Sequence, residues 1–290
     1  RFVMRRRHVL ALGAGVAAAA AVPAAAQKPP RIVAVGSSIT EIIYALGAEK
    51  LLVGVDTTSL YPEVARSLPQ VGYMRALSAE GVLSLKPTLI IATTAAGPAS
   101  VLDQLKATGI EVMVLPDHYD YDSVVTKIAA VGKVTGKVAE ADALIASGRA
   151  TMKALSEKLA TATSHPRVLF LLGMGSGAPQ ASGRGTAADG IIKMAGGMNA
   201  IDGYNGYRPL TPEAVIASKA DYILVTRQTV EAMGSLQAIL DQPAINRTPA
   251  GKAGKVLEFD ALLLLGFGPR TPQAAEQLAL KLHPELARAP

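Results

Sequence analysis

The chain has 290 residues, of which 50% are hydrophobic and 18% are charged, so it can form one or two domains with substantial cores. Aromatic residues make up only 4% and tryptophan is absent, which argues against a nucleic-acid surface built on stacked aromatic rings. The formal net charge is +6, but four arginines lie within the first seven residues. The rest of the chain is therefore close to neutral and lacks the basic field that nucleic-acid binding requires.

Residues 1–26 are typical of an export signal. Arg5, Arg6 and Arg7 precede an apolar, alanine-rich run that ends in Ala24-Ala25-Ala26. We expect cleavage near Ala26 by either the general or the twin-arginine export route, which would leave the mature chain in the periplasm without a membrane anchor. An uncleaved anchor is the alternative, because the apolar run approaches the length that spans a bilayer. Cysteine is absent, which excludes a lipid-modified cysteine and disulfides.

From Arg31 onward, short apolar strands alternate with helical segments. The first predicted helix runs from Ser38 to near Gly47 and opens with a Ser38–Glu41 capping box. Further helices are predicted over 98–108 and 186–195. Strands are predicted at 31–35, 52–55, 88–92, 111–115, 167–172 and 221–225. This alternation favours parallel, doubly wound sheets.

One motif occurs twice, because the segment 78–93 recurs as 211–226 at a constant offset of 133 positions (211 − 78 = 133). The matched positions include a helix-capping hydroxyl, a glutamate, a lysine and a threonine. Between the copies, residues 139–162 contain no proline and many strong helix formers. The sequence predicts an α/β protein with two Rossmann-like lobes, at 27–138 and 164–290, joined by a single long helix at 139–163, with a ligand cleft between the lobes. A surface helix of one larger domain is the alternative.

The segments 31–41 and 78–93, with the linking helix, resemble the helical-backbone class of solute-binding proteins, which serve ABC importers of siderophores, cobalamin and haem. The stretches 72–81, 181–189 and 262–270 are similar to the haem-binding members. The resemblance implies a monomeric periplasmic protein, not an enzyme, that captures haem and delivers it to the membrane permease of an ABC importer. A ferric siderophore or cobalamin is the alternative ligand. An exported enzyme acting on a small anionic substrate is the alternative of another class.

Tyr73 is the residue to which the resemblance assigns the iron of haem. It lies in a loop between a strand and the helix that begins near Ser78, where loops of open α/β sheets face the ligand crevice. A phenolate is a hard oxygen donor that suits ferric iron. Arg75, two residues further on, can supply the positive charge that favours the phenolate. The alternative is a half-buried tyrosine that merely packs on its loop.

Several other residues are expected to support the ligand. Arg227 follows the strand at 221–226 and is expected to face the cleft from the second lobe, where the resemblance implies a contact with the tyrosine oxygen or a propionate. The guanidinium group can bind a carboxylate through two parallel hydrogen bonds. Weaker candidates are Arg208, which is the repeat counterpart of Arg75, and Tyr207 and Arg184.

Glu80 and Glu213 occupy equivalent places in the repeat. The resemblance implies that they dock on arginines of the permease, where charge pairs steer and orient association. The alternative is that each only stabilises the first turn of its helix. The loop that begins Gly173-Met174 lacks the histidine of some two-haem relatives, so a His-ligated second haem is not expected. His118 is expected in a solvated turn.

Overall fold

The computed structural model describes residues 28–174 and 179–287. The predicted export signal, and Ser176 in the loop after residue 172, lie outside these described residues. Within the two ranges, no helix combines the length and the apolar character needed to cross a membrane.

The N-terminal lobe is a parallel sheet covered by helices. Its four strands are β1 (Ile32–Val35), β2 (Leu52–Val55), β3 (Leu89–Thr93) and β4 (Glu111–Leu115), in the order β2-β1-β3-β4. The residues of β1 and β3 are all buried, as expected of parallel strands with helices on both faces. The helices are α1 (Ser37–Ala45), α2 (Ala79–Ser84), α3 (Ala99–Ala107) and α4 (Tyr121–Thr135), with short 3-10 turns at Glu49–Leu51 and Glu63–Ser67.

The C-terminal lobe repeats this plan and extends it. Its parallel strands are β5 (Arg167–Leu172), β7 (Met198–Asn199), β9 (Tyr222–Thr226) and β10 (Val256–Phe259). Two antiparallel strands, β6 (Gln180–Ser182) and β8 (Tyr207–Pro209), continue the sheet beyond β5. Its helices are α6 (Ala187–Met194), α7 (Pro212–Ala217), α8 (Arg227–Met233), α9 (Leu236–Leu240), α10 (Pro243–Asn246), α11 (Pro249–Ala253), α12 (Ala261–Leu265) and α13 (Thr271–Leu282), followed by a 3-10 turn at Pro284–Ala287.

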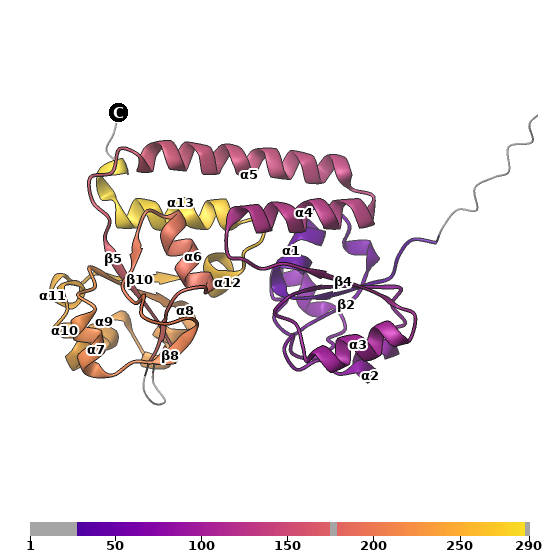
Figure 1. The fold of residues 1–290 in the computed structure, drawn as a ribbon, viewed down its shortest axis with the longest axis horizontal. Helices are drawn as coiled ribbons and strands as arrows, with labels where there is room; N and C mark the ends of the chain where they lie inside the picture. The colour runs from indigo at the N-terminus through magenta and orange to yellow at the C-terminus, as the bar shows by residue number, and fades with distance from the viewer. Residues whose placement is uncertain (1–27, 175–178, 288–290) are drawn as a thin grey trace, which may run out of the picture.

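The lobes are connected by α5 (Val138–Leu159), a continuous helix of 22 residues. Figure 1 shows α5 lying across the top of both lobes, with α13 and α4 beneath it. Helix α13 packs against α4 and α5 as well as against α6, so the C-terminal segment also contacts the N-terminal lobe. The predicted class, an α/β protein with two lobes, is confirmed. The exact limits of the lobes remain a proposal.

One apolar cluster extends across both lobes. It contains Ile42 of α1, Ile128 of α4, Leu155 of α5 and Leu278 of α13, all of them buried, together with Phe170 of β5. Because side chains from both lobes share this cluster, the lobes cannot separate without exposing apolar surface to water. This packing therefore fixes the position of one lobe relative to the other.

The sequence repeat is also a structural repeat. The hydroxyl groups of Ser78 and Thr211 accept hydrogen bonds from the third residue of α2 and of α7, at 3.4 and 3.3 Å. At the other ends of these helices, Lys86 and Lys219 both adopt a φ of 49°. The prediction that the two segments are equivalent is confirmed.

The predicted capping box at Ser38 and Glu41 is wrong. Gly36 is the N-cap of α1, with a φ of 112°, and no side chain caps the helix. Glu41 instead accepts two hydrogen bonds from Arg270, at 2.8 and 2.9 Å, across the two lobes. A glycine tolerates this left-handed backbone, so the helix begins earlier than the capping pattern suggests.

Candidate ligand-binding cleft

A cleft of about 520 Å³ lies between the lobes and is lined by both of them. The N-terminal lobe contributes the start of α1, the loop at 73–75, the end of β3 and the loop after β4. The C-terminal lobe contributes Leu172 of β5, the start of α6, Tyr207 of β8 and the end of α12. Most of these segments follow the carboxyl ends of strands, where ligands bind in open α/β sheets.

Tyr73 and Arg75 both line the cleft. The loop that carries them is fixed by backbone hydrogen bonds, from Ala76 N to Tyr73 O at 2.8 Å and from Gly97 N to Met74 O at 2.8 Å. Tyr73 is 47% exposed, so its ring is accessible to a ligand. The sequence predicted this pair correctly as neighbours at the crevice, while their roles toward a ligand remain predictions.

Two further tyrosines face this cleft from opposite lobes. Burial raises the pKa of Tyr119, with the Asp117 carboxylate adding to the rise and the positive charge of Arg75 opposing it. Burial also raises the pKa of Tyr207, and hydrogen bonds with the Thr186 side chain and the Ala188 backbone oppose this rise, as does Arg75. The positive charge of Arg75 therefore acts to lower the pKa of phenol groups on both walls of the cleft.

Tyr119 lines the cleft but was not among the residues expected there from the sequence. Its ring packs edge-on against Phe267 of the C-terminal lobe, with centroids 5.3 Å apart. Its backbone has a φ of 54°, which is uncommon for a residue other than glycine. The available signal was its position just after the strand that ends at Leu115, next to His118. His118 itself is exposed and is not among the cleft residues.

A buried ion pair underlies the wall of the N-terminal lobe. Lys127 of α4 is completely buried, and its ammonium group binds Asp117, which lines the cleft. The ammonium group also donates to Ser38 Oγ at 3.4 Å. Burial lowers the pKa of Lys127, while the neighbouring carboxylate partly opposes this. Since the pair is internally neutral, Asp117 presents little net negative charge to an anionic ligand.

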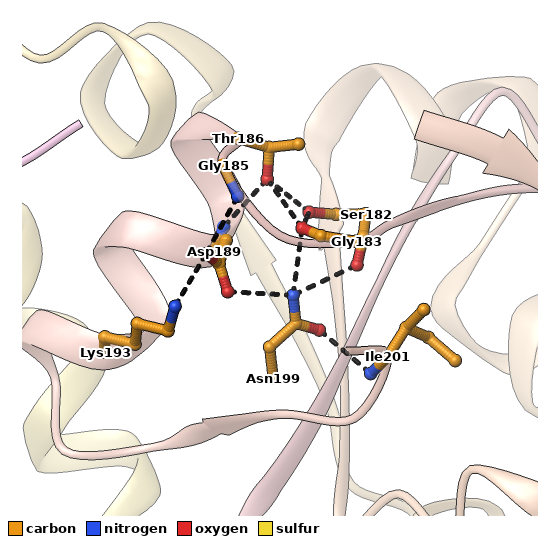
Figure 2. A network of polar contacts seen from close by, with 8 residues as sticks. All are labelled: Ser182, Gly183, Gly185, Thr186, Asp189, Lys193, Asn199 and Ile201. Carbon is orange, nitrogen blue, oxygen red and sulfur yellow. Dashed lines mark hydrogen bonds and ion pairs between the residues drawn. The ribbon is translucent and has the colours of Figure 1, made fainter. Parts of the chain in front are cut away.

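The C-terminal wall is formed by the loop at 183–187, which a polar network holds in place. Figure 2 shows Asn199 donating from its amide nitrogen to Ser182 O, Gly183 O and Asp189 Oδ1, at 3.1 to 3.2 Å. The Thr186 hydroxyl caps α6 by accepting from Asp189 N at 3.0 Å. This network positions Gly185 and Thr186 along the cleft.

The remaining predicted ligand-support residues are not among the residues that line the cleft. Arg227 is the first residue of α8, and its guanidinium group pairs with Glu258 at 3.3 Å. Arg208 stacks over the ring of Tyr204 at 4.9 Å, and Arg184 is exposed next to Gly185. Their proposed ligand contacts remain predictions.

A second cavity, of about 660 Å³, lies within the C-terminal lobe. Its described lining is mainly apolar, including Leu171, Leu210, Val215 and Met233, and contains no charged side chain. The interlobe cleft, by contrast, combines apolar surface with phenol, guanidinium and hydroxyl groups. The interlobe cleft is therefore the better candidate for a ligand site, because it follows the pattern of apolar pockets with a few polar groups.

The chain is similar to solved structures of haem-binding proteins over most of its length. It is 38% identical to the periplasmic heme-binding protein BhuT, in a complex with two hemes, covering 89% of this chain and 99% of that one with a TM-score of 0.84. It is 39% identical to the periplasmic heme-binding protein RhuT from Roseiflexus sp. RS-1, covering 89% and 100% with a TM-score of 0.83.

More distant relatives carry other names. An uncharacterized ABC transporter substrate-binding lipoprotein, YvrC of Bacillus subtilis, is 29% identical, covering 89% of this chain and 82% of that protein. A cobalamin-binding protein of Halobacterium salinarum is 26% identical, covering 88% and 70%. The periplasmic binding protein family matches residues 32–262, which span both lobes and the linking helix. The chain therefore belongs to the periplasmic binding protein family.

Proposed function

We propose that this protein captures ferric haem in the interlobe cleft and delivers it to the permease of an ABC importer. The observation that carries the proposal is the pair Tyr73 and Arg75 at a cleft lined by both lobes. The two similar haem-binding proteins, each covered almost completely, support haem as the ligand. We further propose that residues 1–26 direct export and that the mature protein acts in the periplasm as a monomer.

The donor set favours haem over a free metal ion. Among the described residues, no group of three or more histidine, cysteine, aspartate or glutamate side chains could hold a metal. Haem iron already has four porphyrin nitrogens as ligands, so one axial oxygen such as Tyr73 Oη is sufficient. Apolar lining from Met74, Leu172 and Leu265 suits the faces of a porphyrin, while cationic Arg75 suits its carboxylates.

Cobalamin is the second candidate, because a cobalamin-binding protein is among the relatives. It would occupy the same cleft without using Tyr73 as a ligand to iron. A catalytic role has less support, since the chain contains no cysteine and no histidine is among the described residues that line the cleft. We therefore propose that the protein binds and releases its ligand without changing it chemically.

The first prediction is that Tyr73→Phe removes the tyrosinate-to-iron charge-transfer bands seen when haemin is added to the unaltered protein. Loss of the axial bond should also weaken haemin binding at least about tenfold, or about 1.4 kcal/mol. Absorption titrations of both proteins with haemin test this. Tyr61→Phe is the matched control, because Tyr61 is similarly exposed (43%) but lies outside the cleft. Identical spectra for Tyr73→Phe and the unaltered protein would contradict the proposal.

A further inference from the structure

The first helix of the N-terminal lobe opens into the cleft. Gly36, Ser37 and Ser38 line the cleft at the start of α1, a helix of nine residues without a side-chain cap. The amides of Ser37 and Ser38 have no intrahelical acceptors, because the first turn of a helix has none. The positive end of the helix dipole therefore faces the ligand space.

A buried hydroxyl group lies against this helix start. Thr93, at the end of β3, is 1% exposed and lines the cleft, and its Oγ1 has no hydrogen-bond partner among the described residues. A Cβ placed on Gly36 would lie 3.7 Å from this oxygen, so the hydroxyl and the helix start are neighbours. A buried hydroxyl without a partner costs free energy, which an acceptor on a ligand would recover.

Comparison of the two copies of the repeat shows that, within the described residues, only the N-terminal copy has an unpartnered threonine hydroxyl at this position. Thr226 occupies the position of Thr93 in the second copy. Its Oγ1 caps α8 by accepting from Thr229 N at 3.4 Å. The equivalent hydroxyl group of Thr93 has no hydrogen-bond partner among the described residues. Thr93 is thus free to donate into the cleft.

The charges around the helix start also favour an anion. Lys127 donates to Ser38 Oγ and neutralises Asp117, which leaves the Ser38 hydroxyl proton free to donate toward the cleft. Asp56 is a second nearby carboxylate, and it accepts from Gly36 N, from Thr58 N and Oγ1, and from Ser59 Oγ. Its charge is therefore shared among four donors, while Arg75 adds a positive charge to the same lobe of the cleft.

We infer that the start of α1 and the Thr93 hydroxyl form a carboxylate-binding subsite, which holds one propionate of haem. The inference rests on the proposed function and adds where in the cleft the ligand's charge is bound. The amides of Ser37 and Ser38 would donate to the carboxylate, and the neighbouring Thr93 Oγ1 would donate to it as well. Thr93 has the central role, because its hydroxyl group is buried at the cleft and has no hydrogen-bond partner among the described residues.

The test compares haemin with haemin dimethyl ester, which keeps the iron and the porphyrin but lacks both carboxylates. Thr93→Val removes the hydroxyl at nearly constant volume and should weaken haemin binding about tenfold (about 1.4 kcal/mol). Its affinity for the dimethyl ester should equal that of the unaltered protein, and the tyrosinate bands should persist. Thr93→Ser keeps a hydroxyl and should retain most of the haemin affinity.

Thr271→Val is the matched control. Thr271 Oγ1 is also buried without a partner among the described residues, but it lies outside the cleft, so neither ligand should be affected. An unchanged haemin affinity in Thr93→Val would overturn the subsite, as would an equal loss for both ligands. If the unaltered protein binds neither ligand, the proposed function itself fails.

Discussion

The carboxylate of Asp189 joins the cleft loop to helix α6. It accepts from Gly185 N at 3.1 Å, from Lys193 Nζ at 2.8 Å and from the Asn199 side chain at 3.1 Å (Figure 2). Burial by itself would raise the pKa of Asp189, but these donors outweigh it, and the pKa is lowered from its ordinary value of 3.8. The ionised form is therefore the one that the folded protein stabilises.

A pH dependence of stability follows from this shift. Because the pKa of Asp189 is lower in the folded state, the unfolded chain takes up the proton first as the pH falls. The contribution is complete above about pH 4 and is lost as the pH falls through the folded-state pKa. Asp189→Asn should lower the free energy of unfolding at pH 7 by about 2 kcal/mol and flatten its decline below pH 4.

Chemical denaturation between pH 7 and pH 3 checks this second prediction. Asp142→Asn is a suitable control, because Asp142 is a solvent-exposed aspartate on α5. The control should reproduce the unaltered pH profile. If Asp189→Asn does the same, the carboxylate is not what fixes the cleft loop.

Among the elements, α6 makes a close approach to the opposite lobe at Gly190. A Cβ at this position would lie 2.2 Å from Tyr119 O and 2.9 Å from Tyr119 Cβ. No side chain fits without a shift of the helix or of the loop after β4. Since both segments line the cleft, this contact sets the spacing between its walls.

The third prediction is that Gly190→Ala destabilises the protein by about 1–3 kcal/mol, the usual cost of overpacking. The displaced Tyr119 should also weaken haemin binding, because the cleft walls move apart. Denaturation curves and haemin titrations measure the two effects. Gly203→Ala provides the comparison, since a Cβ at Gly203 would meet nothing within 4 Å. Equal stability of the two variants would mean that α6 adjusts freely.

Across the whole molecule, contacts other than α5 also hold the lobes together. Helix α13 packs on α4, and an apolar cluster spans both lobes. Arg270 reaches from the C-terminal lobe to Glu41 on α1 and stacks 3.5 Å above the ring of Tyr61. Breaking a partly buried ion pair of this kind is costly, so a wide opening of the lobes is disfavoured.

The fourth prediction is that haem binding changes the shape of the molecule very little. Small-angle X-ray scattering of the protein with and without haemin should give nearly the same radius of gyration. Rigid-body motion about the lobes would require the shared cluster and the Arg270–Glu41 pair to rearrange. A clear compaction on adding haemin would show that the lobes hinge despite these contacts.

The fifth prediction concerns delivery to the permease. Glu80 and Glu213 are exposed residues in the first turns of α2 and α7. Figure 1 shows these two helices on different lobes, both on the side away from α5. A permease with two basic patches could thus contact both lobes at once, with charge guiding the orientation.

The double variant Glu80→Ala, Glu213→Ala should leave haemin affinity unchanged and slow haem uptake by vesicles that contain the cognate permease. Substituting Glu63→Ala and Glu231→Ala controls for the loss of two exposed charges, because these glutamates lie on other helical segments of the same two lobes. Normal uptake with the Glu80 and Glu213 variant would mean that these glutamates only stabilise the first turns of their helices and do not dock on the permease.

The sequence by itself determined the repeated α/β plan, the equivalence of segments 78–93 and 211–226, and the proximity of Tyr73 to Arg75. Apolar runs, capping hydroxyls and near neighbours in the chain are local signals, and local backbone geometry preserves them in the fold. The same signals failed at Glu41, which pairs with an arginine 229 positions away rather than capping its own helix.

Only the tertiary structure brought Thr93 against Gly36, Tyr119 against α6 and Lys127 beneath Asp117. It also showed that Arg227 pairs with Glu258, while the predicted contact of this arginine with the ligand stays a prediction. These contacts join segments from different strands and helices, and their energies depend on which charges and hydroxyl groups are buried together. Burial is a property of the packed chain, so the buried polar groups beside the cleft could not be identified from local patterns.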